Sequence, residues 1–294
     1  MRIYNSGKEG GEPCKVLTGH KNKYPVFDID WNSDGRALLS AGGDGSVRLW
    51  DTSISGASGD MLTRKTNTKN QSLSRGADKK KASKTNQITN NIHIPGSNRG
   101  ESIASNNGPS IAVYKGHVPN SPVWSVSFAP SGNYFFSAGA DATARLWTTD
   151  RPLPVRLFSG HTSANANCVG WHPNANYIIT GSDDKTARLW DIQTGQTVRI
   201  LTGSGINVVQ IPPGGRYCAG ADYSGLVHLW DLGSGKNMSF YRPVNTNTTV
   251  REQILHSLSF SACGDALAVG SDDCCIRQQN TEKSDIEICG NGLG

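Results

Sequence analysis

Residues 116–150 read GHVPNSPVWSVSFAPSGNYFFSAGADATARLWTTD, and this stretch decides the fold because its landmarks recur elsewhere in the chain. It opens with a Gly-His pair and closes, apart from a short tail, with Leu-Trp. The same landmarks occur three times at offsets of 30, 30 and 29 residues, from His20 to Trp50, from His117 to Trp147 and from His161 to Trp190. A block that returns at a fixed period predicts an array of one structural unit, and such arrays commonly present surfaces to partners.

Each copy begins with a short run in which every second residue is large and mostly apolar. Five such runs can be aligned, namely Phe27-Ile29-Trp31, Trp124-Val126-Phe128, Asn167-Val169-Trp171, Asn207-Val209-Ile211 and His256-Leu258-Phe260. Side chains two residues apart share one face of a strand, so each run predicts a strand with one packing face. Turn residues separate this strand from three more, which predicts four antiparallel strands in about 42 residues.

The Gly-His and Leu-Trp-Asp blocks resemble those of WD40 repeat proteins. Two copies match in full, and the copy that ends at Trp147 departs only in the following Thr148. A fourth copy keeps Trp230 without the histidine, and a fifth has Gln279 in place of the tryptophan. The resemblance implies an all-β fold, a WD40 β-propeller. We expect it to be incomplete, with five recognisable blades plus partial blades at both ends.

Composition divides the chain into segments with different expected roles. These are a remnant of a preceding blade at 1–12, the propeller at 13–51 and 111–280, a basic Ser/Asn/Lys-rich insertion at 52–110, and an outer-strand remnant and tail at 281–294. The insertion holds few aliphatic residues and cannot bury enough apolar area to offset its ordering entropy, so we expect it to be disordered. A closed five-blade ring is the alternative arrangement, with its last outer strand supplied by residues 14–18 or by the tail.

Charge and cysteine usage exclude several classes of function. The net charge is +5, but residues 52–110 carry +6 and the remainder carries −1, so the predicted propeller shows no nucleic-acid footprint. Seven cysteines are scattered without a CxxC pair, so we expect reduced thiols, no metal and no cofactor. No apolar leader follows Met1 and no apolar run reaches about 18 residues, so we expect neither secretion nor a membrane span.

Four residues recur at fixed offsets within each intact copy, and each quartet is called a tetrad below. The tetrads are His20, Ser40, Asp44 and Trp50; His117, Ser137, Asp141 and Trp147; and His161, Thr180, Asp184 and Trp190. Ser, His and Asp together suggest acyl-transfer chemistry, but the set occurs three times and no GxSxG motif is present. The WD40 resemblance implies structural hydrogen-bond networks. We therefore expect a non-enzymatic protein with no catalytic residue and no small-molecule substrate.

The two degraded copies lack most tetrad members. The fourth has Ser204, Gly220 and Ser224 at the three remaining positions, and the fifth keeps Asp273 but has Val269 and Gln279. A buried polar group that loses its partner costs free energy, so degraded networks support their sheets less well. We therefore expect these two blades to be the least rigid, as hydrogen exchange would report.

Three central stretches resemble one WD40 subfamily, the one that forms subunit 5 of the general transcription factor TFIID. They are YKGH at 114–117 with SPVW at 121–124, ARLWTTD at 144–150 with PVRLFSGH at 154–161, and NCVGWHPNANY at 167–177. The resemblance implies a nuclear protein-interaction scaffold in RNA polymerase II transcription initiation, within TFIID or related SAGA-type coactivators. Its implied partners are histone-fold TBP-associated factors, without direct sequence-specific contact to nucleic acid. An adaptor of another complex, either a ubiquitin-ligase substrate receptor or a signalling scaffold, is the alternative.

Partner contacts cannot be carried over from a motif, but geometry offers candidates. Loops after each Gly-His pair and turns before each tetrad aspartate should meet on one rim of the propeller, and loops commonly carry binding residues. The candidate rim residues are Lys23, Tyr24, Gly43, Asn120, Ala140, Asn165, Asp183 and Tyr223. In the insertion, Lys79-Lys80-Lys81 with Lys84 fits either a nuclear-import patch or a solvated charge run.

Overall fold

The computed structural model describes residues 1–4, 13–21, 23–52, 110–162, 165–241, 254–272, 275–280 and 286–291. The chain separates into two compact units, one made of Met1–Ser53 with Asn106–Gly294 and the other of Ile54–Ser105. The second unit, which covers most of the predicted insertion with its lysine run, lies outside the described residues.

Five four-stranded sheets form the described part of the first unit, together with one two-stranded sheet. Blade 1 contains β3 (Val26–Trp31), β4 (Ala37–Gly42), β5 (Ser46–Asp51) and β6 (Ala112–Lys115). Blade 2 contains β7 (Val123–Phe128), β8 (Tyr134–Gly139), β9 (Thr143–Thr148) and β10 (Arg156–Ser159). Blade 3 contains β11 (Ala166–Trp171), β12 (Tyr177–Ser182), β13 (Thr186–Asp191) and β14 (Thr197–Thr202).

The last two blades repeat this plan. Blade 4 contains β15 (Ile206–Gln210), β16 (Tyr217–Asp222), β17 (Val227–Asp231) and β18 (Asn237–Tyr241). Blade 5 contains β19 (Leu255–Phe260), β20 (Ala266–Ser271), β21 (Cys275–Asn280) and β22 (Ile286–Asn291). Within every blade each strand pairs antiparallel with the next one in sequence, as tight turns between short strands require.

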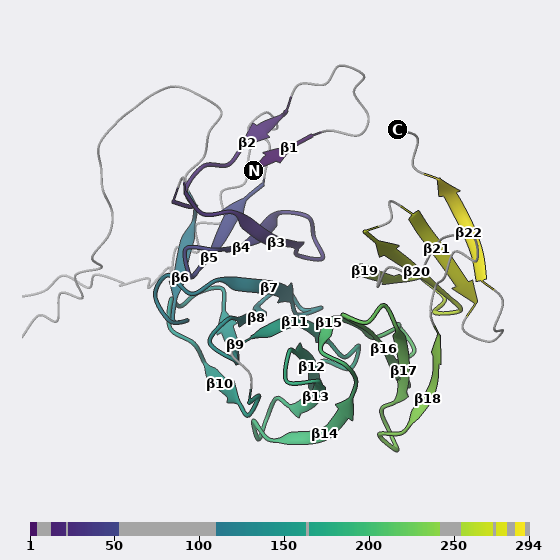
Figure 1. Ribbon diagram of the computed structural model, residues 1–294. Coiled ribbons are helices and arrows are strands. Elements are labelled where there is room, and N and C mark those ends of the chain that lie inside the picture. Colours follow the sequence, from purple (N-terminus) through teal and green to yellow (C-terminus); the bar gives the residue numbers. More distant parts are fainter. Residues whose placement is uncertain are drawn as a thin grey trace, which may run out of the picture. The chain divides into compact units, whose positions relative to one another are not determined.

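The first strand of each blade lies at the inner edge of its sheet. These inner strands are spatial neighbours in chain order, from β3 to β7, β11, β15 and β19. Figure 1 shows the sheets fanned around these strands, with the later strands of each blade farther out. The predicted all-β propeller of five blades is therefore confirmed.

Apolar side chains between successive sheets form the core. Between blades 1 and 2, Leu39 and Val47 pack against Val126 and Phe128, and equivalent clusters join blade 2 to 3, 3 to 4 and 4 to 5. The alternation of each strand places one side chain set toward the preceding blade and the other toward the following blade. Burial of apolar area at about 25 cal/mol per Å² makes these inter-blade layers the main stabilising contribution.

Blade 1 differs from the others on the face of β3 that points away from blade 2. Ile29 and Trp31 are 49% and 43% exposed there, whereas the equivalent Val126 and Phe128 of β7 are 3% and 7% exposed. A smaller cluster covers only the outer part of this face, where Ile3 of β1 packs with Trp50. No sheet among the described residues covers the inner part.

The two ends of the described chain complete different sheets. β1 (Arg2–Ile3) pairs with β2 (Lys15–Val16) in a separate two-stranded sheet, and the blade remnant expected at 1–12 stays a prediction. β22 pairs with β21, so residues of the tail, not residues 14–18, supply the fourth strand of blade 5.

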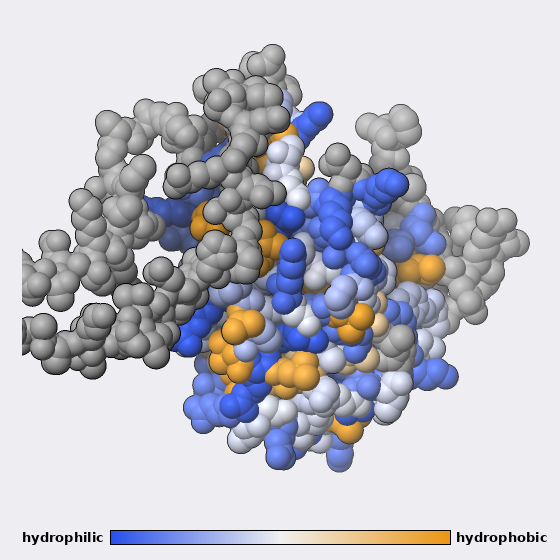
Figure 2. Space-filling view, turned by 90° about the vertical axis from the view of Figure 1, so that its left-hand side faces the viewer, coloured by the Kyte–Doolittle hydropathy of each residue, from blue (hydrophilic) through white to orange (hydrophobic). Residues whose placement is uncertain are grey.

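The surface carries exposed apolar side chains as well as the buried ones. Figure 2 shows a face on which hydrophobic residues form separate patches among hydrophilic ones. In the described part of the chain, no helix is long and apolar enough to cross a membrane.

Candidate functional site

The tetrad of blade 2 joins two loops to two strands. His117 precedes β7, Asp141 lies in the turn between β8 and β9, and their Nδ1 and Oδ1 atoms are 3.0 Å apart. The other ring nitrogen of His117, Nε2, lies 2.7 Å from Oγ of Ser137 in β8. The indole N–H of Trp147 in β9 donates to the same Ser137 oxygen over 2.8 Å. The Ser137 hydroxyl, which a hydrolase would use as its nucleophile, is thus engaged by both His117 and Trp147.

Blades 1 and 3 repeat this arrangement with nearly the same geometry. In blade 1, His20 lies 3.1 Å from Asp44 and 2.7 Å from Ser40, which accepts a 2.8 Å hydrogen bond from the indole of Trp50. In blade 3, the distances from His161 are 2.9 Å to Asp184 and 2.7 Å to Thr180, and Trp190 donates to Thr180 over 2.8 Å. The histidine and aspartate side chains of all three tetrads are at most 8% exposed.

Each tetrad aspartate is a hub for several donors. Asp184 accepts hydrogen bonds from the backbone N–H of Thr162 and from both the N–H and the hydroxyl of Thr186. Burial raises the pKa of Asp184, but these donors and His161 outweigh burial and hold the pKa at about 2. Burial lowers the pKa of His161, although Asp184 counteracts this. The arrangement stabilises an ionised aspartate beside a histidine that is harder to protonate than in water.

A steric constraint explains why glycine precedes histidine in the Gly-His pair. A Cβ added at Gly116 would lie 2.6 Å from the Trp147 ring, far inside normal contact distance. The loop therefore passes the tryptophan closely only because a hydrogen stands where other residues carry a side chain. This contact couples the two landmarks that are 30 residues apart in sequence.

Blade 4 contains a different histidine–aspartate pair that the sequence analysis missed. Asp222, at the end of β16, accepts a 2.8 Å hydrogen bond from Nε2 of His228 in β17, and it also binds Ser224 and the N–H of Leu226. The His228 ring stacks on Trp230 with centroids 5.1 Å apart. The fourth copy therefore has a buried polar network of its own. Its low rigidity relative to the intact blades stays a prediction.

The signal for this pair was present but displaced. The aspartate stands two residues before the position occupied by Ser224, and the histidine lies within the third strand instead of before the first. Gly220 occupies the place of the tetrad hydroxyl, and a Cβ there would lie 2.5 Å from the Trp230 ring. In blade 5, Asp273 lies outside the described residues.

A second candidate site lies along the inner strands. The pairing of every inner strand shifts register near its start, which marks a β-bulge. The residues inside the five bulges are Phe27, Trp124, Asn167, Asn207 and His256, and all five line one cavity of about 640 Å³. This corrects the expectation that the first residue of each alternating run shares the packing face of the other two. The cavity is called the channel below.

The structure distributes the eight candidate rim residues unevenly. Three of them gather at the channel: Asn165 and Tyr223 line it, and Asp183 binds Asn165 and Asn167. Four others do not line the channel: Lys23, Tyr24 and Asn120 are exposed, and Ala140 is half-buried. Gly43 is buried against Phe27 and Pro25, so it can shape this surface but offers little of it.

A chain of polar contacts runs from blade 2 through blade 3 to blade 4, where the carbonyl of Ile206 accepts from Asn167 over 3.0 Å. The indole of Trp124 donates to Asn165 over 3.2 Å, Asn165 donates to Asp183, and Asp183 also accepts from Asn167 over 2.6 Å. Burial and the nearby Asp183 carboxylate raise the pKa of Tyr223 to about 12. Trp124 and Asn167 were not among the candidate site residues, because nothing in a strand pattern marks a bulge.

Comparisons with known proteins place these features in a family. A family model described as "WD domain, G-beta repeat" matches five segments, at residues 11–51, 108–148, 152–191, 195–231 and 246–278. The chain is 29% identical over 263 residues to "Transcription initiation factor TFIID subunit 5" of Caenorhabditis elegans, which is 89% of this chain and 31% of that protein.

Two further relatives match over shorter stretches. "Protein hir1" of Aspergillus terreus is 27% identical over 175 residues, 48% of this chain and 17% of that protein. "Ribosome biogenesis protein erb1" of Neurospora crassa is 52% identical over 40 residues, 13% of this chain and 5% of that protein. The chain thus spans about a third or less of the length of each of these relatives.

Proposed function

The chain belongs to the WD40 repeat family, and from this premise we propose that it is a non-catalytic scaffold of a nuclear transcription complex of the TFIID type. The observation that carries the proposal is the similarity to a TFIID subunit 5, which extends over 89% of the chain instead of a single repeat. The stretches at 114–124, 144–161 and 167–177 resemble the same subfamily. Histone-fold TBP-associated factors are the proposed partners.

The geometry of the tetrads supports a scaffold over an enzyme. The Ser137 hydroxyl already contacts His117 and the indole of Trp147, and its side chain is fully buried. A nucleophile must reach a substrate carbonyl, which a hydroxyl enclosed by an indole cannot do. The threefold recurrence of the set fits a bracing role, since each network ties a loop and a turn to the second and third strands.

Charge and localisation follow from the same proposal. A TFIID-type scaffold works in the nucleus, and its contacts are to protein subunits. Outside residues 52–110 the net charge is −1, so direct binding to nucleic acid is not part of the proposal. The exposed rim residues near blades 1 and 2, which include Tyr24 and Asn120, are the proposed docking surface.

The test is a pull-down of recombinant histone-fold TBP-associated factors with the tagged chain, followed by affinity purification from nuclear extract. Under the proposal these factors are retained, and Tyr24→Ala weakens retention. Tyr134→Ala is the matched control, because this half-exposed tyrosine begins the second strand of blade 2 at the opposite end of the sheets. Retention of ubiquitin-ligase or signalling components without TBP-associated factors would instead support the alternative adaptor function.

A further inference from the structure

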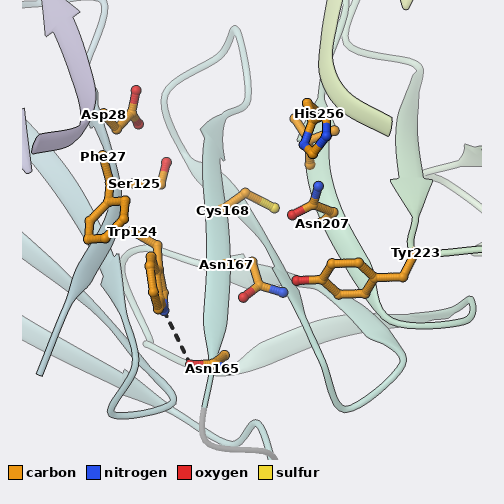
Figure 3. Close-up of a pocket in the computed structure, with 11 residues that line it drawn as sticks. Phe27, Asp28, Trp124, Ser125, Asn165, Asn167, Cys168, Asn207, Tyr223 and His256 are labelled. Carbon is orange, nitrogen blue, oxygen red and sulfur yellow. Dashed lines mark hydrogen bonds between the residues drawn. The ribbon is translucent and has the colours of Figure 1, made fainter. Parts of the chain in front are cut away.

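The channel is separate from the tetrads and is not required for the proposed scaffold role. Its volume of about 640 Å³ lies within the range of about 300–1,000 Å³ that is common for ligand sites. Each blade contributes the residue inside its bulge, so five inner strands present side chains to one space (Figure 3). Bulges often redirect side chains at functional sites.

Aromatic rings form two sides of the channel. Phe27 and Trp124 meet edge to face with centroids 4.5 Å apart, and Phe27 is 44% exposed. Across the channel, Tyr223 is 39% exposed, and its phenol points toward Asn167 in Figure 3. Exposed aromatic faces attract cations through the ring quadrupole.

The amides of Asn167 and Asn207 direct their Nδ2 groups to protein acceptors and leave their Oδ1 atoms open to a ligand. Asn167 uses its Nδ2 group to donate to Asp183 and to the carbonyl of Ile206, over 2.6 and 3.0 Å. Asn207 uses Nδ2 to donate to the carbonyl of Leu255 over 2.7 Å. These acceptors fix which end of each amide faces the wall, because an oxygen could not face another oxygen there. Among the described residues no donor reaches Oδ1 of either asparagine.

The charge of the channel has one sign. Asp28 lines it, and neither lysine nor arginine is among the lining residues. The Asp28 carboxylate accepts hydrogen bonds from the backbone N–H groups of Val126 and Ile29 and from the Ser125 side chain, all of them neutral donors. Burial raises the pKa of Asp28, since the ionised form has lost water without gaining a cation.

We propose that the channel binds a cationic side chain from a partner peptide, and that arginine is the preferred residue. A guanidinium is planar, stacks on aromatic faces and supplies five donors in a fixed arrangement. It matches a space that combines aromatic rings, a carboxylate and unsatisfied amide oxygens. A phosphate or a carboxylate would meet the like charge of Asp28 and the oxygens of these amides.

The test measures binding of a fluorescent Gly/Ser peptide with one central arginine to the full chain by fluorescence anisotropy. The proposal expects a Kd below about 1 mM for this peptide, and at least tenfold weaker binding when citrulline or glutamate replaces arginine. Citrulline keeps the shape and removes the charge. Equal affinity for arginine and citrulline, or the absence of binding to the arginine peptide, would overturn the proposal.

A matched pair of variants on one strand locates the site. Asp28→Asn should weaken binding of the arginine peptide about tenfold, because a charge-assisted contact is lost. Asp30→Asn is the control: Asp30 also lies on β3 and accepts the N–H of Phe128 over 2.7 Å, but it does not line the channel. An equal effect of the two variants would count against the channel as the binding site.

A second pair of variants distinguishes a loss of binding from a loss of folding. Tyr223→Ala removes a half-exposed ring and should weaken binding about fivefold with little change in thermal midpoint. Tyr134→Ala, which removes an equally exposed ring at the far end of a strand, should leave Kd unchanged. Retained affinity in Tyr223→Ala together with retained affinity in Asp28→Asn would refute the assignment. Because the peptide assay needs no TFIID component, its outcome is independent of the proposed scaffold function.

Discussion

Blades 3 and 4 both bury a histidine against an aspartate, yet they build this pair from different places. In blade 3 the pair His161–Asp184 spans 23 residues and fastens the loop before the first strand to a turn. In blade 4 the pair Asp222–His228 spans only six residues and joins the second strand to the third. Both blades therefore satisfy their buried polar groups by hydrogen bonds, although the residues that do so stand at different positions in the repeat.

The loop before the first strand is held by different contacts in the two blades. In blade 3 the N–H of Thr162 donates to Asp184 over 3.0 Å, so the loop is held by the tetrad. In blade 4 the tetrad histidine position is Ser204, and Asp222 is instead satisfied by Ser224, Leu226 and His228. The local pair therefore stabilises its own turn and leaves the preceding loop to backbone contacts.

Removal of each aspartate is the strongest way to break the comparison. Asp184→Ala and Asp222→Ala should each lower the free energy of unfolding by about 3–5 kcal/mol, because each leaves a buried histidine and several N–H groups without an acceptor. Urea unfolding of the full chain measures the change. Asp231→Ala is the control, since Asp231 caps an exposed turn and should cost about 0.5 kcal/mol. A neutral Asp222→Ala would mean that the pair in blade 4 contributes nothing.

Adding a hydroxyl at position 220 tests whether blade 4 merely lacks one tetrad member or is built around a different polar network. Gly220→Ser should destabilise the chain by about 1–3 kcal/mol, because the added Cβ would lie 2.5 Å from the Trp230 ring. Thr180→Ser, which keeps the hydroxyl of blade 3, should cost less. A higher urea midpoint for Gly220→Ser would show that the ring can move aside and that blade 4 merely lacks a member.

Trp190 of blade 3 and Trp230 of blade 4 extend the comparison to the indole hydrogen bond. Trp190→Phe removes the donor to Thr180 and should cost about 1–3 kcal/mol, beyond what the smaller ring loses in packing. Trp230→Phe should cost less, because Gly220 offers no side-chain oxygen for the indole and stacking with His228 is retained. Denaturation curves for both variants, compared in one buffer, give the difference. Equal losses would imply that packing alone sets the cost.

The fold could be predicted from sequence because its determinants are local. Offsets of 30 and 29 residues, turn residues and two-residue alternation fix strand order, and β5 (Ser46–Asp51) ends one residue after Trp50, the landmark of its repeat. The intact tetrads follow from the same offsets. Each member stands at a fixed distance from a turn, and the structure brings all four together.

The rest depends on contacts that no repeat pattern encodes. The runs in β3 and β7 look alike, but Trp31 is 43% exposed and Phe128 is 7% exposed, because among the described residues a sheet packs against the second and none against the first. The channel arises from bulges, which shift one residue per strand out of the alternation. The pair in blade 4 is made by an aspartate and a histidine at positions that the repeat pattern does not mark.

Acid sensitivity is the smallest expected difference, and its sign follows from the pKa shifts. Asp184 has a pKa of about 2 in the folded chain and an ordinary value near 4 when unfolded, so its contribution to stability is present above about pH 4 and is lost as the pH falls toward 2. His161 has a lowered pKa when folded, so the unfolded chain binds protons first and stability also falls below about pH 6.5.

Asp184→Asn separates these two windows. The variant should unfold at a lower urea concentration than the parent at pH 7, but its midpoint should change less between pH 5 and pH 3, because the ionisable group that titrates there is gone. Asp222→Asn should flatten the same window, since hydrogen bonds from His228 and Ser224 outweigh burial and lower the pKa of Asp222 as well. If only Asp184→Asn flattens the curve, the carboxylate of blade 4 is not held ionised by its histidine, and the two pairs are alike in geometry alone.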